Sequence, residues 1–353
     1  MSQQPKLLVD ALRGVRTARA PFWFMRQAGR YLPEYRAVRA TAPDFVRFCL
    51  NPAQAAEVTL QPIRRFGMDA AILFADILLI PYALGLDVAF KEGEGPVLAT
   101  VTHATEIARL ETHLSKAAET LAPVYETVAR VRADLPASCA LIGFAGSPWT
   151  VATYMVEGGG GHDFARVRRM ALREPEDFSR LIQLLVDATV AYLDRQISAG
   201  ADAVQLFDTW AGVLSASEFE RWCIAPTAAI VTKLRARHRD VPIIGFARGA
   251  GTNLVDYGSR TGIDAVGLDA GVAPVWAARQ LPARLCLQGN LDPVLMGIGG
   301  SALDEAAQAI LAAWSSRSFV FNLGHGITPD VPVENVARLS RLLLDWRRPD
   351  SPA

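Results

Sequence analysis

PFWFMRQAGRYLPEYR, residues 21–36, joins an apolar, strand-like run to a charged turn. The run covers residues 22–25, and the turn that follows carries Arg26, Gln27, Gly29 and Arg30. An arginine that ends a buried strand usually has an anionic partner, and its planar guanidinium matches a carboxylate or phosphate through two parallel hydrogen bonds. Gly29 would let the backbone come close to such a ligand. The stretch therefore predicts an anion clamp, and a basic surface loop is the alternative.

Seven further apolar runs follow this stretch, at residues 70–75, 140–145, 203–207, 241–246, 265–268, 285–288 and 319–321. Runs without strict alternation suit strands that are buried on both faces of a parallel sheet. Polar residues close nearly all eight runs, namely Arg26, Asp76, Ser147, Asp208, Arg248, Asp269, Asn290 and His325. Barrel enzymes gather their chemistry at the carboxyl ends of many strands. We therefore predict an α/β protein with a single (β/α)8 TIM-type barrel, and a doubly wound sheet is the alternative.

Helical periodicity separates most of these runs. We expect helices within residues 1–20, 33–49, 51–66, 106–134, 163–200, 217–238 and 333–346. The pair Asn51-Pro52 has the residue types of a helix N-cap and first turn, and residues 80–102 predict an excursion such as a hairpin. The length of 353 residues suits one barrel with extensions. No linker or charge run divides the chain, so we expect one domain over residues 1–353.

The composition excludes several classes of protein. The 36 basic and 36 acidic residues give zero formal net charge, which argues against a nucleic-acid-binding protein. The sequence has no run of about 18 apolar residues and no secretory signal pattern. The four cysteines are scattered without a CxxC pair, which predicts reduced and mostly buried thiols. We therefore expect a soluble, cytoplasmic protein that does not bind membranes.

Cofactor chemistry also finds little support in the residues. The chain has four lysines, none of which closes an apolar run: Lys6, Lys91, Lys116 and Lys233. A Schiff-base or pyridoxal-phosphate mechanism needs a buried lysine nucleophile. His and Cys pairs at the spacing of metal ligands are missing as well, so a transition-metal site is not expected.

Individual candidates each allow two interpretations. Asp76 lies between two apolar runs, where it could accept hydrogen bonds from a ligand and stabilise a cation, or form a structural ion pair. His325 stands between two glycines, and it could face a cavity or be a satisfied core residue. Tyr154 could point its hydroxyl inward or simply pack. The glycines at 158–161 lack P-loop spacing and predict a flexible loop near the mouth of the site.

Taken together, seven stretches resemble the uroporphyrinogen decarboxylase family of the haem pathway. They are FMRQAGRYLPEY at 24–35, FADIL at 74–78, GFAGSPWT at 143–150, YMVEGGG at 154–160, FDTWAG at 207–212, LQGNLDP at 287–293 and FNLGHGITPDVPVENV at 321–336. They follow the family's order along nearly the whole chain. The resemblance implies a single (β/α)8 barrel, a homodimer with clefts facing each other, and no cofactor or metal.

The resemblance also implies a carboxy-lyase that converts the four acetate side chains of uroporphyrinogen III to methyl groups, giving coproporphyrinogen III and four CO2. Asp76 would hold the pyrrole N–H groups and offset a cationic intermediate. Arg26 would donate a proton or bind the leaving carboxylate. The substrate-binding residues it implies are Arg26, Gln27, Ala28, Gly29, Arg30, Asp76, Tyr154, Thr209 and His325. The residues agree with this chemistry, because an octacarboxylate needs arginines and a carbon-protonated pyrrole can act as its own electron sink.

Two other functions need to be weighed. Corrinoid- or coenzyme M-dependent methyltransferases share the barrel, but they bind zinc through a His-x-Cys pair and a later Cys. Here the fifth run reads GFARGAGTN and the eighth ends in NLGHGI, without those ligands. A tetrapyrrole carrier could use the same clamp without turnover. Small departures from the family pattern are Thr209 in place of a common Ser, Ala75 beside Asp76, and Arg248 where Lys is common.

Overall fold

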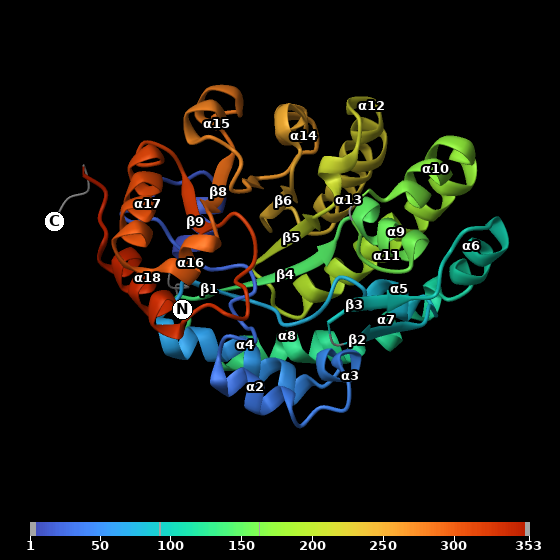
Figure 1. The fold of residues 1–353 in the computed structure, drawn as a ribbon, viewed down its shortest axis with the longest axis horizontal. Coiled ribbons are helices and arrows are strands. Elements are labelled where there is room, and N and C mark those ends of the chain that lie inside the picture. The colour runs from blue at the N-terminus through green and yellow to red at the C-terminus, as the bar shows by residue number, and fades with distance from the viewer. Residues whose placement is uncertain (1–4, 92, 162, 350–353) are drawn as a thin grey trace.

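Parallel strands arranged in chain order form one curled sheet in the computed structural model, which describes residues 5–91, 93–161 and 163–349. The order is β1 (Ala70–Ile72), β4 (Ala140–Gly146), β5 (Ala203–Asp208), β6 (Ile243–Ala247), β7 (Ala265–Gly267), β8 (Cys286–Leu291) and β9 (Phe319–Leu323). Helices surround this sheet on its outer face (Figure 1). Strands β4, β6, β8 and β9 are buried along their whole length, as expected for strands with a core on both sides. The predicted (β/α)8 barrel is confirmed.

The segment that the sequence predicted as the first strand occupies the eighth position of the barrel, between β9 and β1. Phe22 forms an isolated parallel bridge with Phe321 of β9. The amide of Phe321 donates to the carbonyl of Pro21 at 2.8 Å, and the amide of Trp23 donates to the carbonyl of Phe321 at 3.3 Å. On the other side, the amide of Asp69 donates to the carbonyl of Phe22 at 3.1 Å, just before β1. This short segment thus connects the last strand to the first.

An ion pair fixes that closure. The guanidinium of Arg19 binds both carboxylate oxygens of Asp69, at 2.7 and 2.6 Å. The same carboxylate accepts the amide of Phe22 at 2.9 Å. Both charged side chains are largely buried, so their pairing is needed to keep them out of water.

The outer helices lie where the sequence predicted them, but two of the predicted helical regions are divided into shorter helices. Those between the start of the chain and β4 are α1 (Leu7–Leu12), α2 (Pro33–Arg39), α3 (Phe45–Cys49), α4 (Pro52–Phe66), α5 (Leu79–Ala83), α6 (Ala104–Glu111), α7 (Leu114–Thr120) and α8 (Ala122–Asp134). The region 33–49 is therefore two helices and the region 106–134 is three. The side chain of Asn51 caps α4 by accepting the amide of Gln54 at 3.2 Å, as predicted. The excursion contains an antiparallel hairpin of β2 (Val88–Lys91) and β3 (Gly95–Leu98).

The second half of the chain continues the pattern. Its helices are α9 (Pro148–Glu157), α10 (Ala165–Arg173), α11 (Pro175–Ser198), α12 (Ala216–Phe219), α13 (Ala225–Arg235), α14 (Leu254–Arg260), α15 (Pro274–Gln280), α16 (Val294–Ile298), α17 (Gly300–Ala313) and α18 (Val333–Asp345). A π-helical turn over Glu220–Ile224 joins α12 to α13. Helix α9 was not expected, although Ser147-Pro148 has the residue types of a helix start.

Two expectations from the composition can be compared with the structure. All four cysteines are buried and free of disulfides, as predicted. Among the residues that the structure describes, none of the helices has the length and apolar character needed to span a bilayer.

Candidate active site

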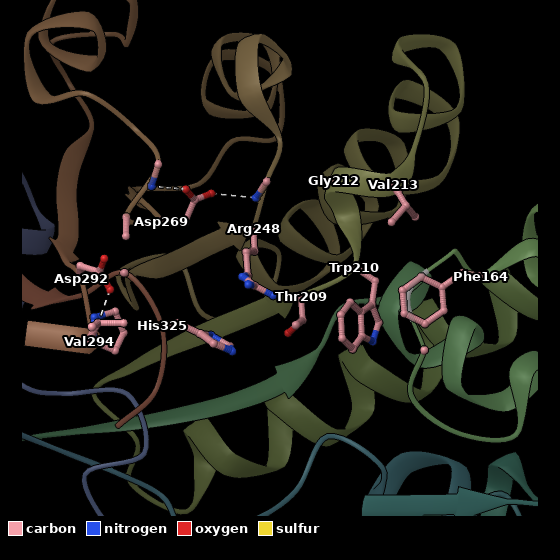
Figure 2. Close-up of a pocket in the computed structure, with 16 residues that line it drawn as sticks. Phe164, Thr209, Trp210, Gly212, Val213, Arg248, Asp269, Asp292, Val294 and His325 are labelled. Atoms are coloured by element: carbon pink, nitrogen blue, oxygen red, sulfur yellow. Dashed lines mark hydrogen bonds between the residues drawn. The ribbon is translucent and has the colours of Figure 1, made fainter. Parts of the chain in front are cut away.

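The carboxyl ends of the strands surround a cavity of about 540 Å³ (Figure 2). Most of its lining side chains lie on loops that follow strands, which is the usual place for chemistry in a barrel. Thr209 and Trp210 follow β5, Arg248 follows β6, Asp269 follows β7, Asp292 follows β8 and His325 follows β9. Phe164, directly before α10, forms part of the wall beside Trp210, with the two ring centroids 4.7 Å apart.

The arginine turn is built around a left-handed residue. Arg26 has φ of 61°, a conformation that side chains with a Cβ rarely adopt and that often marks functional sites. Gln27 shapes the turn from inside: its Oε1 accepts the amide of Phe24 at 3.1 Å, and its Nε2 donates to the carbonyl of Ala70 at 3.1 Å. Its side chain is fully buried. The predicted substrate-binding residue Gln27 therefore uses its amide group to hold the turn.

Gly29 has a similar local role. A Cβ at this position would lie 2.9 Å from the carbonyl oxygen of Arg26, so the turn itself requires glycine. The sequence had assigned Gly29 to close approach of a ligand. Arg30 is exposed on the same turn and Ala28 is half-buried.

Arg26 lies against the loop after β9. A Cβ on Gly326 would lie 2.7 Å from Cγ of Arg26, and the amide of Ile327 donates to the carbonyl of Met25 at 2.9 Å. The guanidinium is exposed, and within the described part of the chain it makes no ion pair. The turn thus presents an unneutralised cation next to His325.

Asp76 lies in the turn between β1 and α5. One carboxylate oxygen accepts the amide of Leu78 at 2.8 Å. Burial raises the pKa of Asp76 to about 6, and the bond from Leu78 and the charge of Arg26 partly oppose that rise. Asp76 and Arg26 are therefore close enough to influence each other, yet no ion pair joins them among the described residues. Both charges remain available to a ligand.

Tyr154 connects this pair to the cavity wall. It lies on α9, and burial raises the pKa of its phenol, with Asp76 adding to the rise and Arg26 opposing it. Its ring centroid lies 6.0 Å from that of Trp210, which lines the cavity. The hydroxyl is thus within the electrostatic influence of both charged groups.

The positive charges of two guanidinium groups act on the imidazole of His325. Burial, together with the charges of Arg26 and Arg248, lowers the pKa of its imidazole to about 4, against an opposing effect of Asp269. The ring is therefore neutral near pH 7 and available as a hydrogen-bond donor and acceptor. Figure 2 shows it pointing into the cavity with Arg248 and Thr209.

The charge of Arg26 acts on Asp76, Tyr154 and His325, which places these three predicted site residues around the arginine turn. Thr209 and His325 line the cavity, whereas Arg26, Asp76 and Tyr154 are not among its lining residues. The glycine loop is anchored rather than free at its start. Gly158 ends α9 with φ of 82° and Gly159 bridges to Val97, while Gly161 reaches the cavity; His162 lies outside the described residues.

Asp208 closes β5, as the sequence indicated, but its side chain does not face the cavity. It is fully buried. Its carboxylate accepts the hydroxyl of Thr150 at 2.5 Å and the thiol of Cys223 at 3.0 Å, and burial raises its pKa to about 6. The Thr150 hydroxyl in turn accepts the amide of Trp210 at 3.1 Å. Asp208 therefore holds the loop after β5 from beneath.

Several lining residues were not proposed from the sequence. Arg248 was noticed as a strand end and a departure from the family pattern, and Asp269 as a strand end. Trp210 and Asp292 lay unremarked inside quoted motifs. Phe164 carried no signal, since it precedes a helix rather than following a strand. Within the described residues, no group of three or more His, Cys, Asp or Glu side chains is arranged to hold a metal ion.

Comparison with known proteins points to one family. Residues 3–345 match the family model described as uroporphyrinogen decarboxylase (URO-D). A protein of that name from Sphingopyxis alaskensis is 56% identical, covering 96% of this chain and 98% of its own length. Its namesake from Rhizorhabdus wittichii is 55% identical over 94% of this chain and 95% of its own.

A solved structure supports the fold independently. The methyltransferase from Methanosarcina mazei has a TM-score of 0.77 at 17% sequence identity and covers 97% of this chain and 99% of its own. At so low an identity the likeness concerns the barrel alone.

Proposed function

Because the chain belongs to the uroporphyrinogen decarboxylase family, we propose that it converts the four acetate side chains of uroporphyrinogen III to methyl groups, giving coproporphyrinogen III and four CO2. It is a carboxy-lyase of porphyrin biosynthesis. The observation that supports this reaction best is the unpaired Asp76 beside the exposed Arg26. A carboxylate and a guanidinium that do not neutralise each other can each bind an opposite charge on the substrate.

The chemistry proposed for these groups balances in protons and electrons. A proton added to a pyrrole carbon makes the ring cationic. The bond between the acetate CH2 and its carboxylate then breaks, CO2 leaves, and the bond electrons neutralise the ring. The exocyclic carbon next gains a proton to become a methyl group and the ring carbon loses one, so each step consumes one proton overall.

The roles proposed for the residues follow from charge. The Asp76 carboxylate accepts the pyrrole N–H groups and stabilises the cation where it develops, which is the most effective use of a fixed charge. Arg26 binds the reacting carboxylate. A guanidinium keeps its proton at any ordinary pH, which favours this binding role over proton donation.

Peripheral groups complete the proposed site. Arg30, Tyr154, Thr209 and His325 bind other carboxylates, and the backbone around Ala28 sets the position of the clamp. Gln27 and Gly29 support that position through the turn described above. We further propose that the protein acts as a single domain over residues 1–353 and as a cytoplasmic homodimer, without a cofactor, metal, membrane or nucleic acid as partner.

Anaerobic incubation of the purified protein with uroporphyrinogen III and a chelator tests the function. Products are oxidised and separated by carboxyl number. We expect porphyrins with seven down to four carboxyls to appear stepwise. A folded protein that binds the substrate but removes no carboxyl would be a carrier, and one that does not bind it would return attention to methyltransferase chemistry.

The activity is expected to depend on pH through Asp76. Its pKa of about 6 means that the carboxylate is ionised above that value and protonated below it. If the ionised form is required, kcat/KM falls about tenfold per pH unit below pH 6. The imidazole of His325, with a pKa of about 4, stays neutral over this range and contributes no such change.

A pH profile of kcat/KM from pH 5 to 8, for the wild type and for His325→Gln, makes this measurement. The variant should keep the fall near pH 6 at a lower absolute rate. Loss of that fall in His325→Gln would assign it to the imidazole instead.

A further inference from the structure

Arg248 contributes a guanidinium that forms no ion pair among the described residues. It follows β6, is half-buried, and its guanidinium points into the 540 Å³ cavity with Thr209 and His325 (Figure 2). Its backbone amide donates to the carbonyl of Asp208 at 3.0 Å, which fixes where the side chain starts. Within the described part of the chain its guanidinium makes neither an ion pair nor a hydrogen bond. A partly desolvated guanidinium in this state is suited to an anion from outside the chain.

The carboxylate of Asp269, which also lines the cavity, accepts two backbone amides. One oxygen of Asp269 accepts the amide of Gly249 at 2.7 Å, and the other accepts the amide of Gly271 at 2.9 Å. Asp269 therefore holds together the loops after β6 and β7, as the dashed lines in Figure 2 show. It shapes the cavity beside Arg248, and within the described residues it forms no ion pair with the Arg248 guanidinium.

This position is distinct from the arginine clamp. Arg26 lies against Gly326, just after β9, whereas β6 is separated from β9 in the sheet by β7 and β8. Arg26 also lies outside the cavity lining to which Arg248 contributes. The site thus offers two cations on separate elements, which separate carboxylates of one large ligand could bind.

We propose that Arg248, with the hydroxyl of Thr209 beside it, forms a second carboxylate subsite that binds a side chain of the tetrapyrrole which is not the one reacting. This inference rests on the proposed function. The substrate carries eight carboxylates, and only one of them reacts at a time at Arg26 and Asp76. The others need counter-charges elsewhere in the site.

The kinetic consequence separates Arg248 from the residues at the reacting group. A carboxylate that does not react keeps the same charge and position in the ground state and the transition state. An interaction with it stabilises both equally, so its loss raises KM and leaves kcat almost unchanged. Arg248 is thus a binding residue that holds the macrocycle in place.

Steady-state kinetics with uroporphyrinogen III test this on Arg248→Gln, Arg248→Lys and a control, Arg279→Gln. Arg279 is exposed on α15 and outside the cavity, so its loss removes the same charge from the chain. We expect Arg248→Gln to raise KM about tenfold or more with kcat within about threefold. Arg248→Lys should fall between this variant and the wild type, because an ammonium lacks the two-pronged geometry. The control should match the wild type.

Unchanged KM in a folded Arg248→Gln protein would overturn the proposal, as would a loss confined to kcat. If that variant does not fold, Arg248→Lys and Thr209→Val carry the same test, and wild-type KM in both would overturn it. If the wild-type protein lacks decarboxylase activity, the proposed function fails on its own. Fluorescence titration with uroporphyrin III then decides the subsite separately: weaker binding by Arg248→Gln than by Arg279→Gln supports it, and equal binding refutes it.

Discussion

Replacing Asp76 with asparagine is expected to lower kcat by a factor of about a thousand or more, the range for loss of a group that stabilises transition-state charge. Asparagine keeps the shape of the side chain and an oxygen that can accept the amide of Leu78. It removes the negative charge that would offset the cationic pyrrole. The effect should fall on kcat more than on KM, because the cation exists only along the reaction path.

The same substitution should not weaken the fold. The pKa of Asp76 in the folded protein is about 6, above its ordinary value of 3.8. The folded state therefore favours the protonated acid, and the stability from this group, present below pH 4, is lost as pH rises through 6. At pH 7 asparagine avoids that cost, so the free energy of unfolding should stay equal or rise by on the order of 1 kcal/mol.

Steady-state kinetics and urea unfolding at pH 7 measure both effects, with Asp87→Asn as the control at an exposed aspartate before β2. A kcat within tenfold of the wild type would remove Asp76 from the mechanism. A marked drop in unfolding free energy would make it a structural residue.

The second large effect is expected at Arg26. Arg26→Gly should lower kcat/KM by a factor of about a thousand, since it removes the cation proposed to bind the reacting carboxylate. The backbone, however, gains: glycine adopts φ of 61° without the strain that a Cβ brings, which offsets its larger entropy in the unfolded chain. The unfolding free energy should therefore remain within about 1 kcal/mol of the wild type.

Arg26→Lys is the matched comparison, since it restores the charge but keeps the strain and lacks the fork of donors. It should recover part of the activity, and its unfolding free energy should match that of the wild type, which carries the same backbone strain. The two variants are assayed in parallel for kcat/KM and for denaturant unfolding. Near-normal turnover by Arg26→Gly would show that the clamp serves the turn rather than the substrate.

The barrel was predictable because its buried runs leave a clear pattern, as in residues 140–145, which became β4. The exceptions have local causes. The run at 22–25 forms only a bridge at Phe22, because the chain turns at the left-handed Arg26 before a ladder develops. Nothing in a one-dimensional pattern shows that a non-glycine residue will adopt that conformation.

The sequence predicted which kinds of residue lie at the strand ends, but not which way their side chains point. Asp208 and Arg248 both follow apolar runs. The Asp208 side chain is buried and hydrogen-bonded to Thr150 and Cys223, whereas the Arg248 side chain faces the cavity. Strand ends reveal that a polar group lies near the rim but not which way the next residues turn. Likewise the resemblance implies Gln27 as a substrate-binding residue, and the bonds to Phe24 and Ala70 add a role inside the turn that the sequence did not indicate.

The bridge between Phe22 and Phe321 has a consequence for protein synthesis. It joins the two ends of the chain, and with the bond between Met25 and Ile327 it sets Arg26 beside His325. Because the entropic cost of loop closure grows only slowly with length, joining such distant segments costs little more than joining near ones, once both have been made. A nascent chain that has not yet been translated past residue 327 nevertheless lacks one half of this junction. Premature termination within the last strand should thus yield an inert polypeptide rather than a partly active one.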